Sequence, residues 1–404
     1  MLSGDWKGVV HMKKLNVRSR KTFSQWLREN RWAIVVLAVA AVLFVVVERL
    51  ARPEPEESLQ AGDYAEYETG RVAEVLTDST VLDPIADNSY RGEQLLLVDV
   101  TSGQYKGEQL QVYNYASPLY GSRLRAGDGV TVLISTYESG EVRATIFEYN
   151  REPAIFAVIA VFLIVTVLVG GKTGAKSLVG LLITLACLFW ILIPLLMKGA
   201  PMILTVFLVC SYAAAVCFVL LGGITRKTLC AMLGTVLGMG FALLFGLLAQ
   251  SLARISGLRS SEVEPLLQLR QQGTMIGLRG LLVGGIVIST LGAVMDVAMS
   301  ISSALTEVHT ANPAYGRKEL FRSGMNIGRD MVGTMTNTLI LAFFGSSFVL
   351  ILYLYSLGLS RHQLLSSAYL AWEVISGISS SIGVILSVPI TALVSSVLLA
   401  KSKV

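Results

Sequence analysis

The 404-residue chain is 53% hydrophobic and only 15% charged, and its formal net charge is +5. With a mean hydropathy of +0.63, this composition excludes a wholly soluble protein, and the small net charge gives no sign of a nucleic-acid-binding protein. The charges gather in residues 1–152 and in a few short later segments beside apolar runs, which is typical of a membrane protein.

The N-terminal segment, residues 1–31, is polar and basic, and an apolar run from Trp32 to Val47 follows it. The run is short for a membrane span but sufficient if flanking side chains reach the interface. A cleaved signal peptide is the alternative. The long preceding segment and the lack of a small-x-small cleavage site favour an uncleaved transmembrane helix over 32–50. The basic residues ahead of it predict a cytoplasmic N-terminus.

A small β domain is predicted over residues 63–150, after a polar, proline-containing linker at 51–62. Polar and apolar residues alternate there in short stretches, separated by turn signals such as Asp87-Asn88 and Ser139-Gly140. About five or six short strands of this kind indicate a barrel of the OB or SH3 type. The sequence of this domain contains no recognisable catalytic triad or metal-ligand cluster.

Seven further apolar runs follow Pro153, and each predicts a membrane-spanning helix. The predicted spans are 154–170, 177–197, 202–222, 229–253, 280–304, 331–357 and 376–399. Lys and Arg gather in alternate connections, which places both termini in the cytoplasm and the β domain outside. We therefore expect a polytopic α-helical membrane protein of about eight transmembrane helices. Its bundle covers 153–400, and a small extracytoplasmic all-β barrel-like domain lies between helices 1 and 2.

Two connections are long enough to have structure of their own. Residues 254–279 mix arginines with Glu262 and Glu264 and are predicted to lie along the membrane surface as an amphipathic segment. After the turn at Asn312-Pro313, basic residues predict a short amphipathic helix on the cytoplasmic surface, where its arginines fix the topology.

The cysteines and histidines make no metal-binding pattern. Four cysteines lie in apolar runs or at their edges and are interpreted as packing residues: Cys187, Cys210, Cys217 and Cys230. The three histidines are far apart. The sequence also has no phosphate-binding loop, intramembrane zinc pattern or paired-aspartate motif, so we expect neither a cofactor nor an enzyme.

Asp296, an acid inside the sixth predicted span, is the best candidate for a functional residue. Ionisable groups are costly inside a membrane, so such an acid indicates function by default. At 100° per residue, an arc of about 60° on this helix holds Asp296, Ser300, Ser303 and Glu307. Hydrocarbon offers such a stripe no partners, so it must face other helices or water. A structural acid hydrogen-bonded within the bundle is the alternative.

The seventh and eighth spans carry two more polar faces. In the seventh they are Asp330, Thr334 and Asn337, flanked by Thr336 and Thr338. These groups could coordinate a dehydrated cation or pass a proton, or simply join helices. Glycines at 328, 333 and 345 predict close helix approach. In the eighth span they are Glu373, Ser376, Ser380, Gly383 and Ser387, with Pro389 bending the helix. Glu373 also fits an outer interface, and the three faces could meet as one polar path.

Three stretches in the last three spans resemble the YibE/F family of bacterial membrane proteins. They are GAVMDVAMSISSALTEV, GRKELFRSGMNIGRDMVGTMTNTLILAFFG and SIGVILSVPITAL. The likeness covers the β domain and all later spans. It implies a bacterial plasma-membrane protein with the β domain outside, in a family for which a transport role is suspected.

The same region is similar in plan to the core of SecD/SecF and other RND-type proton-driven permeases. There, a membrane carboxylate takes up and releases protons, and Asp296 would match it, with Thr334 and Asn337 opposite. The chain departs from that pattern in its smaller outer domain, its larger number of helices and its lack of a paired Asp motif. The likeness is therefore an analogy of mechanism.

Two functions are compatible with these features. The first is a secondary transporter or ion-coupled permease in which Asp296 binds a proton or cation. The second is a non-transport envelope assembly or sensing scaffold whose β domain binds a partner outside. Eight spans and an acid within one of them exceed what an anchor needs, which favours the first. The expected partners are the lipid bilayer and an unidentified ion or small molecule, not nucleic acid, and a homo-oligomer is left open.

Overall fold

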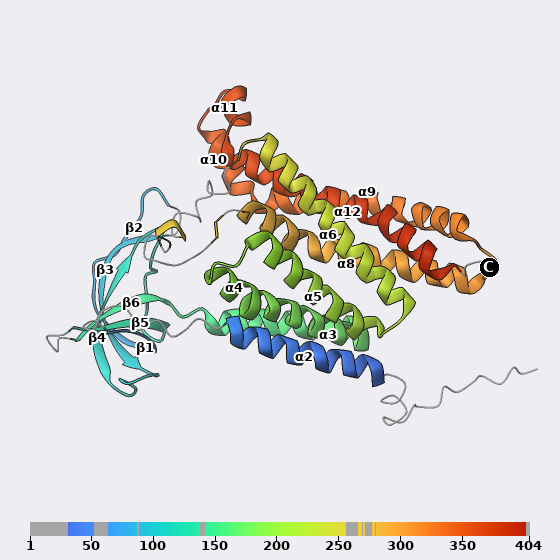
Figure 1. Ribbon diagram of the computed structural model, residues 1–404. Helices are drawn as coiled ribbons and strands as arrows, with labels where there is room; N and C mark the ends of the chain where they lie inside the picture. The colour runs from blue at the N-terminus through green and yellow to red at the C-terminus, as the bar shows by residue number, and fades with distance from the viewer. Residues whose placement is uncertain are drawn as a thin grey trace, which may run out of the picture. The chain divides into compact units, whose positions relative to one another are not determined.

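The computed structural model describes residues 31–51, 64–86, 89–137, 142–255, 266–268, 270, 277, 278 and 280–400. The chain divides into two compact units, residues 54–175 and the remainder of the chain. The first unit contains a β barrel and the start of a long helix, and the second is a bundle of helices (Figure 1).

The β domain has six strands, and five of them close into a barrel. The six strands are β1 (Tyr64–Asp78), β2 (Val81–Leu82), β3 (Tyr90–Val100), β4 (Gln109–Ala116), β5 (Gly129–Thr136) and β6 (Val142–Tyr149). The strand order is β1-β5-β6-β4-β3-β2, and a further pairing of β1 with β3 closes the sheet. Only the β4–β6 contact is parallel among the described pairings. A closed five-stranded barrel with this order is of the OB type, which decides between the two barrels predicted from the sequence.

Alternation along β3 builds the core of the barrel. Every second side chain of β3 points inward and is buried: Gln94, Leu96, Val98 and Val100. The Gln94 amide nitrogen donates to the Leu124 carbonyl oxygen at 3.0 Å, and its amide oxygen accepts from the Leu124 N–H and the Asn114 side chain at 2.9 Å. Because these buried polar groups have partners, they hold the segment around Leu124 against β3 and β4.

Helices make up most of the rest of the described chain. They are α2 (Arg31–Ala51), α3 (Glu152–Ala186), the π-helix η1 (Cys187–Leu192), α4 (Ile193–Met197), α5 (Met202–Gly222), α6 (Arg226–Leu252), α8 (Leu281–Ala311), α9 (Arg317–Ser346), α10 (Phe348–Ser356), α11 (Arg361–Leu365) and α12 (Ala368–Leu399).

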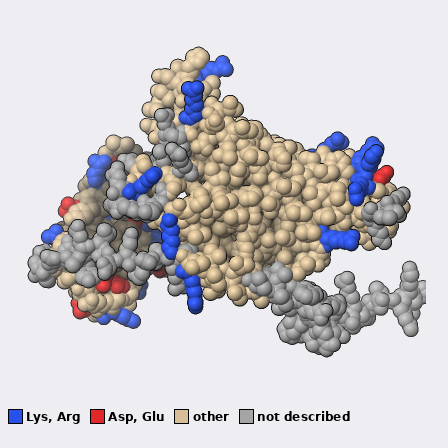
Figure 2. Space-filling view, viewed as in Figure 1, with Lys and Arg blue, Asp and Glu red and all other residues tan. Residues whose placement is uncertain are grey.

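Their length and composition identify a membrane protein. Five helices of the described chain are long and apolar enough to cross a membrane, and the bent pair of α9 and α10 makes a sixth. In Figure 2 no charged side chain is seen over the middle of the visible face of the helices, and Lys and Arg gather at its ends. The predicted class of helical membrane protein is therefore confirmed, while the count of eight spans stays a prediction.

The longest continuous helical stretch, from Glu152 to Met197, is divided by a sharp turn. A straight helix of its 46 residues would be about 69 Å long, more than twice the hydrocarbon thickness of about 30 Å. At Gly171 the backbone leaves the helical region, with φ 54° and ψ −136°. The chain folds back so tightly that a Cβ on Gly174 would collide with the Thr166 carbonyl oxygen. Each half is thus long enough for one span, and the two spans at 154–170 and 177–197 stay a prediction.

Small residues let α6 and α12 pack in close contact. Gly234, Gly238 and Ala242 recur every fourth residue on α6 and lie against Thr391, Ser387 and Gly383 of α12, in antiparallel order. A Cβ on Gly238 would lie 2.9 Å from the Ser387 Cβ and from the Val294 Cγ1 of α8. This is the small-xxx-small packing of membrane helices, and it brings α6, α8 and α12 together as the core of the bundle.

The structure corrects two predictions around α9. The stretch after Asn312-Pro313 is not a short surface helix, because it forms the first half of the 30-residue α9. Its face at Leu320, Gly324 and Gly328 is buried, against α12 and α8. The span predicted at 331–357 is not one straight helix, since α9 and α10 meet at a bend of 58°. The amphipathic segment predicted at 254–279 lies mostly outside the described residues.

Candidate functional site

A stripe of small and polar residues runs along one face of α8. It recurs every three or four residues and consists of Gly285, Ser289, Gly292, Asp296, Ser300, Ser303, Glu307 and Thr310, hereafter the α8 stripe. All of these are exposed except Ser303, which is half-buried. At 100° per residue they occupy an arc of about 80°. The opposite face, which includes Val294, Ala298 and Leu305, is buried.

Asp296 is the middle residue of the 31-residue α8. Its side chain is exposed, and no hydrogen bond or ion pair holds it within the described part of the chain. The described residues therefore do not show the acid hydrogen-bonded inside the bundle that was the alternative interpretation. An ionised carboxylate in hydrocarbon is strongly unfavourable, and a polar stripe needs partners. This face of α8 must therefore meet water or another polar surface when the protein is in a membrane.

Ser303 links the α8 stripe to the beginning of α6. The Lys227 Nζ donates to the Ser303 hydroxyl at 3.1 Å. From the sequence, the basic residues between the predicted spans were expected only to set the topology, so this contact was missed. It brings a positive charge to within two turns of Asp296 along the same helix.

The polar residues of α9 are also exposed. The three predicted candidates on this helix are all exposed to the surroundings of the protein: Asp330, Thr334 and Asn337. The Thr334 hydroxyl donates to the Met331 carbonyl oxygen at 3.2 Å, so it is bonded to its own helix. Of the glycines expected to allow close approach, Gly328 does so, because a Cβ there would collide with Val388. Glycines 333 and 345 have no described atom within 4 Å of a Cβ position, so the expectation is wrong there.

The polar face of α12 is divided between two environments. Ser380, Gly383 and Ser387 are buried in the bundle core, where the Ser380 hydroxyl lies 2.9 Å from that of Ser289 on the α8 stripe. Ser376 is half-buried, and Pro389 lies within the helix. Glu373 is separate from this group, because its Oε2 accepts a hydrogen bond from the Ser347 hydroxyl at 2.5 Å. Ser347 is the residue between α9 and α10, and no pattern in the sequence predicts that it pairs with Glu373.

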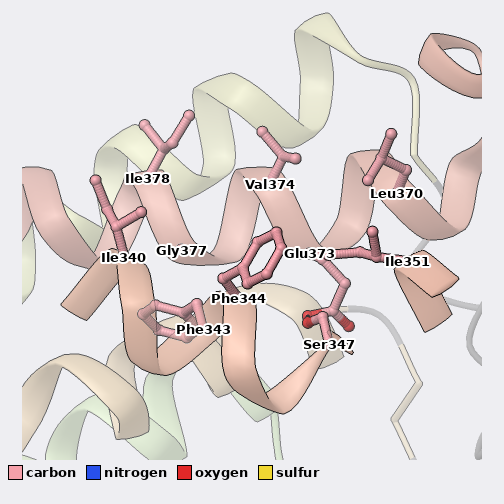
Figure 3. Close-up of a pocket in the computed structure, with 10 residues that line it drawn as sticks. All are labelled: Ile340, Phe343, Phe344, Ser347, Ile351, Leu370, Glu373, Val374, Gly377 and Ile378. Atoms are coloured by element: carbon pink, nitrogen blue, oxygen red, sulfur yellow. The ribbon is translucent and has the colours of Figure 1, made fainter. Parts of the chain in front are cut away.

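Glu373 and Ser347 lie at one side of an apolar pocket (Figure 3). One wall comes from α9 and α10 and includes Phe343 and Ile351. The other wall comes from α12 and includes Leu370. In Figure 3 the Glu373 carboxylate points toward Ser347 at the turn between α9 and α10, and the other labelled side chains are apolar.

The comparison with known families agrees with the motifs of the last spans. The model of the YibE/F-like protein family matches residues 158–401. The chain belongs to the YibE/F-like family. The match begins after the β barrel, so it covers the helices that follow the barrel and neither α2 nor the barrel, over which the expected likeness is not shown. No curated protein and no solved structure matches the chain.

The candidate residues of this YibE/F-like protein lie in the matched region, but they do not form one cluster. Among the described residues, no hydrogen bond joins the side chains of Asp296, Asp330 and Glu373, and no three His, Cys, Asp or Glu side chains are grouped as metal ligands would be. The α8 stripe and the polar face of α9 are exposed, whereas most of the α12 face is buried in the core. The acids thus fall into two places: the exposed faces of α8 and α9, and the pocket beside Glu373.

Proposed function

We propose that this YibE/F-like protein is a secondary transporter or ion-coupled permease in which Asp296 takes up and releases the coupling proton or cation. The proposal places it in the bacterial plasma membrane with both termini in the cytoplasm and the β barrel outside. The α8 stripe is the observation that carries it. It is an exposed row of small and polar residues along a helix otherwise apolar enough to span a membrane, and an acid lies at its midpoint.

The chemistry of such a stripe supports an aqueous path. Glycines at 285 and 292 leave space beside the helix, since no described atom lies within 4 Å of a Cβ position on either. Hydroxyl groups at 300 and 303 can replace part of the hydration shell of a proton carrier or cation. Glu307 lies farther along the same face. Water along this face would solvate the Asp296 carboxylate and remove most of the cost of its charge.

The polar face of α9 lies at the same level on a neighbouring helix, although it is turned away from the contact with α8. The helices are consecutive and touch where the Ile301 Cδ1 lies 3.4 Å from a Cβ position on Gly328. From this contact, Asp296 is about 7.5 Å along α8, and Thr334 is about 9 Å along α9 in the matching direction. Thr334 is therefore level with Asp296, and Asp330 and Asn337 lie within one turn of it. Charging or neutralising Asp296 would change how these faces can be solvated or packed, which couples occupancy to conformation.

The experiment is a flux measurement in liposomes. Purified wild-type protein and the Asp296→Asn and Asp296→Ala variants are reconstituted, and proton or cation movement is followed under an imposed gradient. We expect flux in the wild type and its loss in both variants, while Glu319→Gln, which changes an exposed acid in the first turn of α9, keeps it. Full activity of Asp296→Asn in cells or liposomes would refute the titrating carboxylate.

A scaffold is the second candidate, and the surface of the barrel favours it. Four exposed aromatic side chains lie on three strands: Tyr113 and Tyr115 are stacked at 6.5 Å on β4, and Tyr67 meets Phe147 edge-on at 5.0 Å. Exposed aromatic groups are enriched at binding surfaces. In the scaffold case, deleting residues 63–150 abolishes function in cells while any flux through the helices is unchanged.

A further inference from the structure

The pocket between the bend of α9 and α10 and the helix α12 has the size of a small-ligand site. Its volume is about 270 Å³, near the lower end of the range of roughly 300–1,000 Å³ for ligand pockets. It exists because the chain turns by 58° at Ser347 and because Gly377 leaves room opposite, where a Cβ would lie 3.3 Å from the Phe343 ring. A single aliphatic chain or one ring fits such a volume.

The rim of the pocket is apolar and faces outward. Ile340, Phe344, Val374 and Ile378 border it, and each is 47–51% exposed. All four side chains belong to helices long and apolar enough to cross a membrane, alone or as a bent pair. In a bilayer such a rim contacts lipid tails, so a ligand enters from the hydrocarbon and must itself partition into it.

Glu373 gives the pocket a single negative group. A carboxylate can accept about four hydrogen bonds, and within the described residues the Ser347 hydroxyl is the one donor to Glu373. No Lys, Arg or His of the described chain forms an ion pair with it. A charged group in apolar surroundings is unfavourable unless it is paired, so the pocket is short of one cationic hydrogen-bond donor.

The donor set distinguishes between classes of ligand. One carboxylate and one hydroxyl do not supply the six or more oxygen ligands that Ca²⁺ takes, or the octahedron that Mg²⁺ requires. An anionic amphiphile would meet like charge. A neutral one would leave the carboxylate unpaired. An ammonium group on an apolar chain satisfies both parts of the pocket, because its N–H groups reach Glu373 and its chain covers the apolar walls.

We propose that this pocket binds an amphipathic organic cation, with the ammonium group against Glu373 and Ser347 and the hydrocarbon part against Phe343, Ile351 and Leu370. The site is separate from the α8 stripe, and binding there does not depend on Asp296. The proposal therefore goes beyond ion coupling and can stand or fall without it.

Binding of tritiated decylammonium to the full-length protein in lipid nanodiscs tests this directly, with empty nanodiscs as the blank. Competition by 1-decanol and by decanoate, which have the same chain with a neutral or negative end, measures the charge preference. The test variants are Glu373→Gln, which keeps the shape and removes the charge, and Val374→Trp, which fills the rim from an exposed position and keeps the charge. The matched control is Glu319→Gln.

The wild type is expected to prefer decylammonium over 1-decanol by about tenfold or more, the effect of one charge-assisted pair. Glu373→Gln should lose this preference while binding 1-decanol as the wild type does, Val374→Trp should bind neither, and Glu319→Gln should behave as the wild type. The proposal is overturned if Glu373→Gln retains the preference, or if decanoate competes as well as decylammonium. Asp296→Asn should bind decylammonium normally, so a failure of the transport proposal is distinguishable from a failure of this one.

Discussion

Replacing Gly238 with alanine tests the packing that holds the bundle together. The new Cβ would lie 2.9 Å from both the Ser387 Cβ and the Val294 Cγ1. Carbon atoms in contact are about 3.5–4.0 Å apart, so α6 must move by roughly 0.6–1.1 Å. The Ser387 Cβ is bonded directly to the α12 backbone and cannot rotate away. Overpacking of this kind costs about 1–3 kcal/mol.

Gly240 provides the matched control on the same helix. A Cβ there meets only the Phe207 ring, at 4.0 Å, which is an ordinary contact. Both substitutions gain the same helix propensity, up to about 1 kcal/mol, so their difference isolates the overpacking. In SDS-induced unfolding in mixed micelles, followed by far-ultraviolet circular dichroism, Gly238→Ala should be less stable than Gly240→Ala by about 1–3 kcal/mol. Equal stabilities would refute the close contact of α6 and α12.

Two further predictions concern the barrel and can be followed by hydrogen exchange of its strands in the full-length protein. The Thr80 side chain, its N–H and Arg123 hydrogen-bond to Asp78 and lower the pKa of Asp78 from 3.8 to about 2. A carboxyl group whose pKa is lower in the folded than in the unfolded state stabilises the fold at pH values above the unfolded-state pKa, and this stabilisation is lost as the pH falls through the folded-state pKa. Asp78→Asn should therefore reduce protection from exchange at pH 7 and not near pH 2. Gln94→Ala should cost about 1–3 kcal/mol, because it leaves the buried Asn114 amide and the Leu124 N–H and carbonyl short of partners; unchanged protection around Leu124 would contradict this.

The sequence predicted best those elements whose ends are set by residues next to them in the chain. The span at 202–222 coincides with α5 because Pro201 precedes it and the Gly222-Gly223 pair ends it. The strands followed from alternation, as in β3, where every second residue from Gln94 to Val100 is buried. The fold class and the small barrel could therefore be predicted, because both follow from patterns that extend over only a few residues of the sequence.

Features set by contacts between distant segments were not predictable in the same way. The stretch 317–330 is too polar to read as part of a span, and it is helical because Gly324 and Gly328 pack on Ala392 and Val388 of α12. The Glu373–Ser347 pair spans 26 residues and exists only because α9 and α10 bend. The small residues of α6 at intervals of four could have predicted its close packing on another helix, but not which helix.

The candidate site shows the same division. The periodicity of Asp296, Ser300, Ser303 and Glu307 predicted a shared face, and all four do lie on the α8 stripe. Whether that face is covered depends on where α5, α9 and α12 sit, which the spacing of residues along one helix does not contain. The burial of the α12 serines and the exposure of the α8 acids are therefore findings of the structure.

The most direct test of the account is whether water reaches the middle of α8. In membrane vesicles, Gly292→Cys and Ser300→Cys, one turn on either side of Asp296, are treated with a charged thiosulfonate reagent. The four native cysteines are buried and give a low background, and Ala298→Cys, on the packed face, is the control. The account predicts that both stripe positions react and Ala298→Cys does not. Stripe positions that stay unmodified in folded protein would place this face against lipid or another helix and contradict an aqueous path past Asp296.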